Sequence, residues 1–105
     1  MDVILSTVLH LEYSLEWSIR ETAMIRLTPR LCRAARALVG FEQKDLAEAS
    51  GVSKSTIGAF EIKSETSRLA TMNNKALVEA FERAGLQFVE ENGGGPGVRL
   101  RRRAE

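Results

Sequence analysis

The sequence predicts a mainly α-helical fold, in which a compact group of four helices is followed by a β-hairpin. Three observations support this prediction. Apolar residues recur at helical spacing in four stretches between residues 28 and 84, and a glycine directly follows three of them. A glycine-rich segment near the C-terminus separates two short runs that are typical of strands. The chain has 105 residues, which suits one small domain with a single core.

Residues 1–27 are expected to form an N-terminal extension that contains a strand. From Leu9 to Ile19 every second residue is apolar, and this two-residue period favours a half-buried strand. A helix is the alternative, because Leu11, Leu15 and Ile19 are four residues apart and neither glycine nor proline interrupts them. The extension is expected to cover the core or to pair with the C-terminal hairpin.

The first helix of the domain is expected to begin at Pro29. Thr28 offers a capping hydroxyl, and proline is favoured at the first helical position. Gly40 should end this helix, and its three arginines are expected to lie off the buried stripe. That stripe is expected to consist of Leu31, Ala34, Ala35 and Leu38. The single cysteine, Cys32, is expected to be a small packed side chain rather than a reactive thiol.

The segment from Gln43 to Glu61 predicts two short helices joined by a tight turn. Gly51 can adopt the left-handed conformation that ends the first of them, and Ser53 is a good N-cap for the second. In the second helix, Ile57 and Phe60 should point inward. The opposite face carries small or polar residues with no role in a core, namely Lys54, Ser55, Gly58 and Ala59. This arrangement is typical of helix-turn-helix DNA-binding proteins.

A polar, irregular loop is expected over residues 62–70, followed by a fourth helix. Thr71 should cap that helix, which runs to about Ala84, and Gly85 should terminate it. Its apolar stripe is expected to consist of Ala76, Leu77, Ala80, Phe81 and Ala84. Strands are then expected over residues 86–90 and 98–101, because Asn-Gly between two such runs is a strong hairpin signal. A phosphate-binding loop is the less favoured interpretation, since no helix follows the glycines.

Four groups of residues, taken together, indicate a protein family more specifically than any one group does alone. They are Arg33-Ala34-Ala35-Arg36, Gln43 with Leu46-Ala47, Gly51-Val52-Ser53 with Ile57, and Phe60-Glu61. Together they resemble the Xre type of helix-turn-helix protein, which includes phage repressors and Cro-like regulators. The segment after Ala84 is similar to a hairpin tail found on a bacterial subgroup of small regulators in that family, so the resemblance covers about three-quarters of the chain.

The resemblance implies a DNA-binding role for particular residues. Gln43 would correspond to the glutamine that contacts a phosphate in the family. The loop at residues 62–70 departs from the family pattern, because it lacks the usual glycine and proline. In such a family Met24 would be a natural start, so residues 1–23 are expected to be an accessory element or a start-site artefact.

Composition and charge narrow the classes of function. The net charge is only +1, but arginines crowd the segments at residues 26–36 and 99–103, which suits contact with phosphates as well as with solvent. His10 is the only histidine, so a histidine-based metal site or catalytic triad is not expected. We expect no enzymatic activity and no cofactor. No apolar run is long enough to cross a membrane, and a cytoplasmic setting is expected.

The sequence therefore predicts three parts: an extension over residues 1–27, a helix-turn-helix DNA-binding domain over 28–84, and a hairpin with a basic tail over 85–105. The predicted function is that of a sequence-specific transcriptional regulator, a repressor, which binds double-stranded DNA as a homodimer and reads the major groove with the helix at about residues 54–61. The alternative is an antitoxin-like or other protein-binding module, whose partner contacts the N-terminal strand or the hairpin. The predicted DNA-binding residues are Gln43, Lys44, Ser53, Lys54, Ser55, Thr56, Gly58, Ala59, Lys63 and Arg68.

Overall fold

A computed structural model describes residues 25–90 and 93–101 of the chain. Its elements, in order, are α2 (Pro29–Val39), α3 (Gln43–Ser50), α4 (Lys54–Glu61), α5 (Thr71–Arg83), β1 (Leu86–Val89) and β2 (Gly97–Leu100). Four helices followed by an antiparallel hairpin confirm the predicted fold class for this part of the chain. The strand predicted from Leu9 to Ile19 lies outside the described residues.

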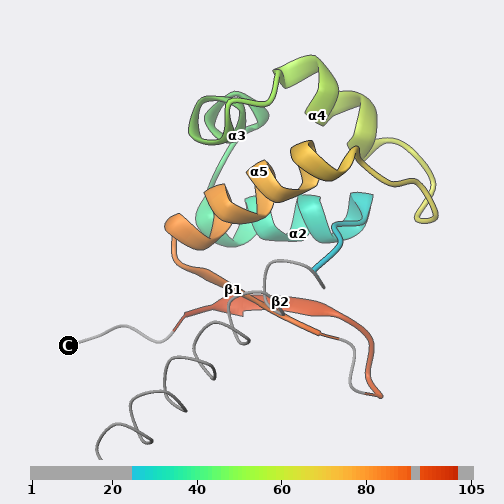
Figure 1. Ribbon diagram of the computed structural model, residues 1–105. Helices are drawn as coiled ribbons and strands as arrows, with labels where there is room; N and C mark the ends of the chain where they lie inside the picture. Colours follow the sequence, from blue (N-terminus) through green and yellow to red (C-terminus); the bar gives the residue numbers. More distant parts are fainter. Residues whose placement is uncertain (1–24, 91–92, 102–105) are drawn as a thin grey trace, which may run out of the picture.

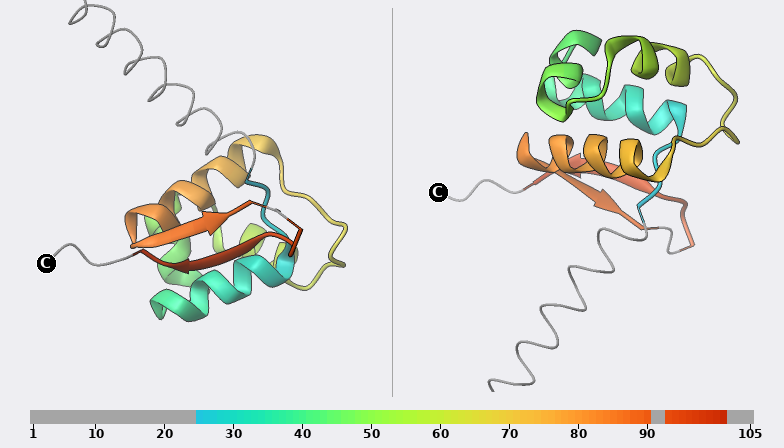
Figure 2. Two further views of the ribbon diagram at one scale, coloured as in Figure 1. Left: turned by 90° about the horizontal axis from the view of Figure 1, so that it is seen from below. Right: turned by 45° about the horizontal axis from the view of Figure 1, so that its top comes forward.

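The helices separate the hairpin from the helix-turn-helix segment. Figure 1 shows α3 and α4 on one side of α2 and α5, with β1 and β2 on the other. Strand β1 packs against α5 and β2 against α2, and the two further views agree with this arrangement (Figure 2). The outer surface of α4 and the hairpin therefore face away from each other.

The predicted helix caps are confirmed at Thr28, Gly40, Gly51 and Ser53. The Thr28 hydroxyl accepts a hydrogen bond from the Leu31 amide at 3.1 Å, and the Ser53 hydroxyl accepts one from the Thr56 amide, also at 3.1 Å. Gly51 ends α3 with a φ of 79°, in the left-handed region that glycine enters without a steric cost. The cap predicted at Thr71 is wrong. Ala70 is the N-cap of α5, and the Thr71 backbone is already helical, so its hydroxyl is not at the capping position.

The buried face of α2 is shifted from the predicted one. Ala34 is exposed and Leu38 is 41% exposed, whereas Cys32 and Ala35 are fully buried. The shift arises because α2 turns the side of the helix that carries Arg36 toward the end of α4. In α5 the predicted stripe is correct for Leu77, Ala80 and Phe81 and wrong at its end. Ala84 lies beyond the last helical residue and is exposed, whereas Val78, which the prediction omitted, is buried.

The hairpin closes the core from below α2 and α5 in the view of Figure 1. Leu86 pairs with Leu100 and Phe88 pairs with Val98, and Leu86 and Phe88 are both buried. The Phe88 ring packs edge-to-face on Phe81 with the ring centroids 6.1 Å apart. The Arg101 amide donates to the Gly85 carbonyl at 2.7 Å, which extends the pairing beyond β2.

The chain enters the core before α2. Ile25 and Leu27 are both buried, although they precede the boundary that the sequence places at Thr28. Asn74 of α5 holds this segment, because its side-chain amide donates to the Ile25 carbonyl and accepts from the Leu27 amide, both at 2.9 Å. The packed unit therefore begins at least as early as Ile25.

Candidate nucleic-acid interface

Helix α4 has one face in the core and one face on the surface of the molecule. Ile57 and Phe60 are buried, as predicted, and anchor the helix against the core. On the opposite side, Lys54, Ser55 and Ala59 are exposed. The exposed face is small and polar, and Lys54 is its only long side chain.

The side-chain hydroxyls at the start of α4 are hydrogen-bonded to one another. Ser53 Oγ accepts from the Thr56 amide and donates to Thr56 Oγ1 at 2.8 Å, while Ser55 Oγ lies 3.3 Å from Ser53 Oγ. Because Thr56 Oγ1 accepts from Ser53, the Thr56 hydroxyl keeps its own proton to donate to an outside acceptor. Ser53 thus serves mainly as the cap, and Ser55 and Thr56 are the hydroxyls available to a ligand.

Gln43 stands where the start of α3 meets the middle of α4. It is the first residue of α3, and its side chain lies against Gly58 of α4. A Cβ placed on Gly58 would be 3.2 Å from Gln43 Oε1. The same side-chain amide donates from Nε2 to Glu61 Oε1 at 3.0 Å. The structure therefore brings together three positions, Gln43, Gly58 and Glu61, that are up to 18 residues apart in sequence.

Glu61 is a buried carboxylate that the sequence prediction assigned no role beyond a family motif. Its side chain is 2% exposed and forms a two-point ion pair with Arg36, whose Nε donates to Oε2 at 2.8 Å and whose Nη2 donates to Oε1 at 2.7 Å. The Cys32 thiol donates to Oε2 at 3.1 Å. We name these four residues, Cys32, Arg36, Gln43 and Glu61, the Glu61 cluster.

The protonation of the Glu61 cluster follows from these contacts. Burial alone would raise the pKa of Glu61, but hydrogen bonds from Arg36, Gln43 and Cys32 outweigh it and hold the pKa below its ordinary value. Burial, together with the hydrogen bond to Glu61, raises the pKa of the Cys32 thiol far above its ordinary value. Cys32 is therefore a protonated, packed donor, which agrees with its predicted role. The Arg36–Glu61 pair is charged.

Arginines of α2 also donate to backbone carbonyls, one at the end of α4 and one in the segment between α2 and α3. The Arg33 guanidinium donates to the Glu61 carbonyl, and Arg36 Nη1 donates to the Phe41 carbonyl at 3.0 Å. A signal for this arrangement is present in the sequence. Glu61 follows Phe60 directly and lies four residues after Ile57, so it falls on the buried side, where a carboxylate needs a basic partner.

The remaining predicted residues lie on α3 and in the loop after α4. Lys44 is exposed, and its amine lies 3.6 Å from a carboxylate oxygen of Glu42. Lys63 and Arg68 are exposed in the loop after α4. In the same loop the Glu65 carboxylate accepts from the Arg30 amide at 2.7 Å, and this hydrogen bond lowers the pKa of Glu65.

Ile62 is a further member of this surface that the sequence prediction did not include. It is the C-cap of α4 and is 86% exposed. Its spacing of three residues from Ala59 places it at the end of the exposed face of α4. The spacing is visible in the sequence, but an apolar residue beside Phe60 is more readily assigned to the core.

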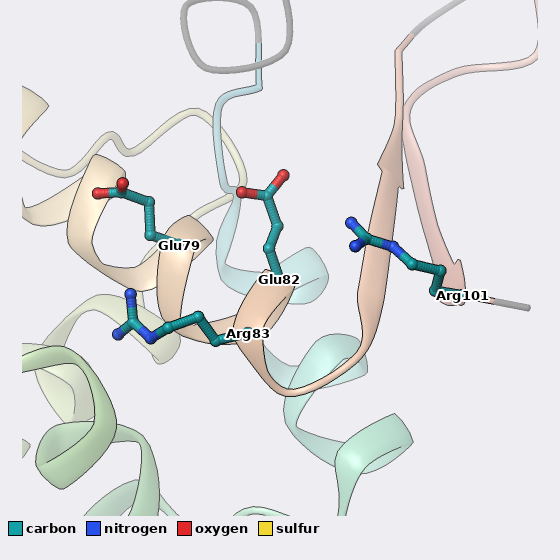
Figure 3. A pocket seen from close by; sticks show the side chains of 4 residues that line it. All are labelled: Glu79, Glu82, Arg83 and Arg101. Atoms are coloured by element: carbon teal, nitrogen blue, oxygen red, sulfur yellow. The ribbon is translucent and has the colours of Figure 1, made fainter. Parts of the chain in front are cut away.

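A hollow of about 370 Å³ lies elsewhere, between α5 and the end of the hairpin. It is lined by Glu79, Glu82 and Arg83 of α5 and by Arg101 (Figure 3). No residue of α4 lines it, so it is separate from the candidate interface. Among the described residues, no group of three acidic, histidine or cysteine side chains is placed to hold a metal ion, and no helix is long and apolar enough to cross a membrane.

Comparison with protein families agrees with the geometry. Residues 33–68 match the family model described as "Helix-turn-helix". The match begins in α2, includes α3 and α4 and ends in the following loop, and it spans about a third of the chain. No curated protein gave a match to the chain. The class that the fold and this match support is that of a DNA-binding helix-turn-helix protein. Families of this class regulate transcription and are generally not enzymatic.

Proposed function

We propose that this protein is a sequence-specific transcriptional repressor that inserts α4 into the major groove of double-stranded DNA. The observation that carries the proposal is the division of α4 into a firmly anchored inner face and a polar outer face. Ile57, Phe60 and the Glu61 side chain fix the helix from inside, while Lys54, Ser55 and Ala59 remain exposed. An α-helix of this kind fits the major groove, where base edges present distinct patterns of donors and acceptors.

The residues on the outer face of α4 suit different types of contact with DNA. Lys54 has the reach to donate to a guanine edge or to a phosphate, and the Ser55 and Thr56 hydroxyls can bond to bases or backbone. Ala59 and Ile62 offer apolar groups that suit a thymine methyl. Because direct contacts of this kind are few, DNA shape is expected to contribute to specificity.

Three cations outside α4 supply the phosphate contacts. Lys44 precedes α4 in the sequence, Lys63 and Arg68 follow it, and all three are exposed. If each neutralises one phosphate, the logarithm of the binding constant should fall with the logarithm of the salt concentration with a slope of about −3 per domain. Gln43 adds a neutral donor that would hold the register without affecting this slope.

We further propose that the protein binds as a homodimer. One domain of this size contacts little DNA, whereas a two-fold dimer doubles the contacts and reads two half-sites. The described sheet has two strands, so both of its edges lack a partner strand within the described residues. Leu38 and Leu100 are exposed apolar residues near the ends of α2 and β2, which finish on the same side of the molecule (Figure 1). The protein-binding alternative is not favoured, because the family match is to a DNA-binding class.

The decisive experiment is the selection of bound sites from random double-stranded DNA with the purified protein. We expect a recovered palindrome, and we expect the protein to lower expression from a reporter promoter that contains it. Lys54→Ala should lower the affinity for the recovered site and relax its sequence preference, whereas Lys75→Ala, an exposed lysine of α5, should leave binding unchanged. Failure to enrich any sequence above the starting pool, or equal effects of the two substitutions, would contradict the proposal.

Sedimentation tests the dimer separately. We expect a dimer at micromolar concentration, either free or on DNA, and a shift toward monomer in Leu100→Glu. Met72→Glu is the matched control, because Met72 is also an exposed apolar residue but lies at the start of α5. A monomer under both conditions would rule the dimer out.

A further inference from the structure

Gly58 stands in the middle of the helix that we propose reads DNA. Glycine is a poor helix former, since it has the greatest backbone freedom to lose. Its φ is not in the left-handed region, so the backbone of α4 does not require glycine at this position. The reason for glycine is therefore to be sought in the space that a side chain would occupy.

The side chain of Gln43 borders that space closely. A Cβ on Gly58 would lie 3.2 Å from Gln43 Oε1, 3.7 Å from Nε2 and 3.8 Å from Cδ. The first distance is shorter than ordinary van der Waals contact, so even alanine would press on the amide group. The amide is at the same time held on its other side, where Nε2 donates to the buried Glu61 carboxylate at 3.0 Å.

We propose that Gly58 is a positioning residue for DNA binding, which acts by leaving room for the Gln43 amide to lie against α4. The inference rests on the proposed function. Nε2 carries two N–H bonds, and one of them is donated to Glu61. Within the described residues the other has no acceptor. It is the donor that a DNA phosphate beside α3 would use.

The Glu61 cluster orders the Gln43 side-chain amide before DNA binds. Glu61 is fixed by Arg36 and Cys32, and Gln43 is fixed in turn by its hydrogen bond to Glu61, for which Gly58 leaves room. A side chain that is already ordered loses less conformational entropy on binding. The arrangement therefore couples α2, α3 and α4 to one phosphate contact, and Gly58 contributes by having no side chain.

The inference separates stability from binding, because Gly58→Ala should affect DNA binding more than stability. Alanine favours the helix, and this gain offsets the loss of the hydrogen bond from Gln43 to Glu61, so the melting temperature should change little. The DNA affinity should fall by about tenfold, which is the order expected for the loss of one hydrogen bond to a charged group. A purely structural role for Gly58 would instead lower both.

A double-mutant cycle on the selected DNA site provides the test. We expect Gln43→Ala and Gly58→Ala each to weaken binding by a similar factor, and we expect the double variant to be no weaker than either single one. If Gly58→Ala binds as tightly as the wild type, or if it weakens binding equally in the presence and absence of Gln43, the inference is overturned. If the wild type itself binds no DNA, the proposed function fails first, so the two failures are distinguishable.

The free protein offers a second readout that needs no DNA. In a ¹H–¹⁵N spectrum, the side-chain amide signals of Gln43 should shift in Gly58→Ala, because the added methyl displaces the group from Glu61. Ser55→Ala is the matched control. It changes an exposed residue of the same helix whose hydroxyl lies beside Ser53 Oγ, and it should leave those signals in place. Unshifted Gln43 signals in Gly58→Ala would also overturn the inference.

Discussion

The buried Glu61 carboxylate gives the sharpest prediction about stability. Glu61→Gln keeps the size of the side chain and removes its charge. One of the two oxygens that accept from Arg36, Cys32 and Gln43 becomes an NH₂ group, which places a donor against donors. Breaking a buried ion pair typically costs 3–5 kcal/mol. Arg36 keeps 20% of its side chain exposed and can recover some hydration, so we expect about 3 kcal/mol, at the lower end of that range.

Such a loss is a large part of the stability of a small domain, which is typically about 5–15 kcal/mol. It corresponds to a fall in melting temperature of roughly 12–24 °C for a domain of this size. Urea unfolding at pH 7 measures it as a lower midpoint with an unchanged slope. Glu48→Gln is the matched control, because it makes the same chemical change at an exposed position of α3 and should stay within about 0.5 kcal/mol of the wild type.

The pH dependence has a definite sign. The pKa of Glu61 is lower in the folded protein than its ordinary value, so the unfolded chain takes up the proton first as the pH falls. The contribution of Glu61 to the free energy of unfolding is therefore fully present above the ordinary carboxyl pKa of about 4.3, and it is lost as the pH falls from there through the folded pKa. The difference between wild type and Glu61→Gln should shrink over that range. A difference at pH 7 no larger than that of Glu48→Gln, or one that does not change below pH 4, would refute the reasoning.

Three further substitutions test the packing by thermal and urea unfolding. Phe81→Ala removes a fully buried ring that contacts Phe88 and should cost about 3–5 kcal/mol, and a cost below about 1 kcal/mol would contradict a core built around this ring. Asn74→Ala leaves the Ile25 carbonyl and the Leu27 amide without their partner and should cost about 1–3 kcal/mol, whereas no loss would show that the entering chain is not held there. Gly51→Ala forces a side chain into the left-handed region and should cost about 1 kcal/mol, while Gly94→Ala, at a glycine without positive φ, should cost less.

The elements of the fold could be predicted from the sequence because their signals are local. Thr28-Pro29, Gly51 and Ser53 determine helix ends through atoms within a few residues of themselves, and the structure confirms them. The buried face of α2 could not be predicted in the same way. Its phase is set by a contact between α2 and the end of α4, 25 residues away in sequence. The helical period alone predicted that Leu38 is buried. The ion pair of Arg36 with Glu61 instead leaves Leu38 on the outer side of α2.

The candidate site was predictable in part for the same reason. The exposed face of α4 follows from the helical period once Ile57 and Phe60 are assigned to the core, so Lys54, Ser55 and Ala59 could be predicted to be exposed. The neighbour of Gly58 could not, since Gln43 reaches it across the turn between two helices. Ile62 was missed because exposure of a large apolar residue runs against the usual preference.

The shortness of α4 gives these long-range contacts their importance. A helix of eight residues with a central glycine is not expected to be stable in isolation, because nucleating a helix is costly and glycine weakens it further. Its position must therefore come from its inner side, where Ile57 and Phe60 pack and where Arg33 and Arg36 hold Glu61. None of these anchors lies on the outer face. The outer residues Lys54, Ser55 and Ala59 therefore do not hold the helix in place. The same fold can for this reason present different side chains to DNA at these positions.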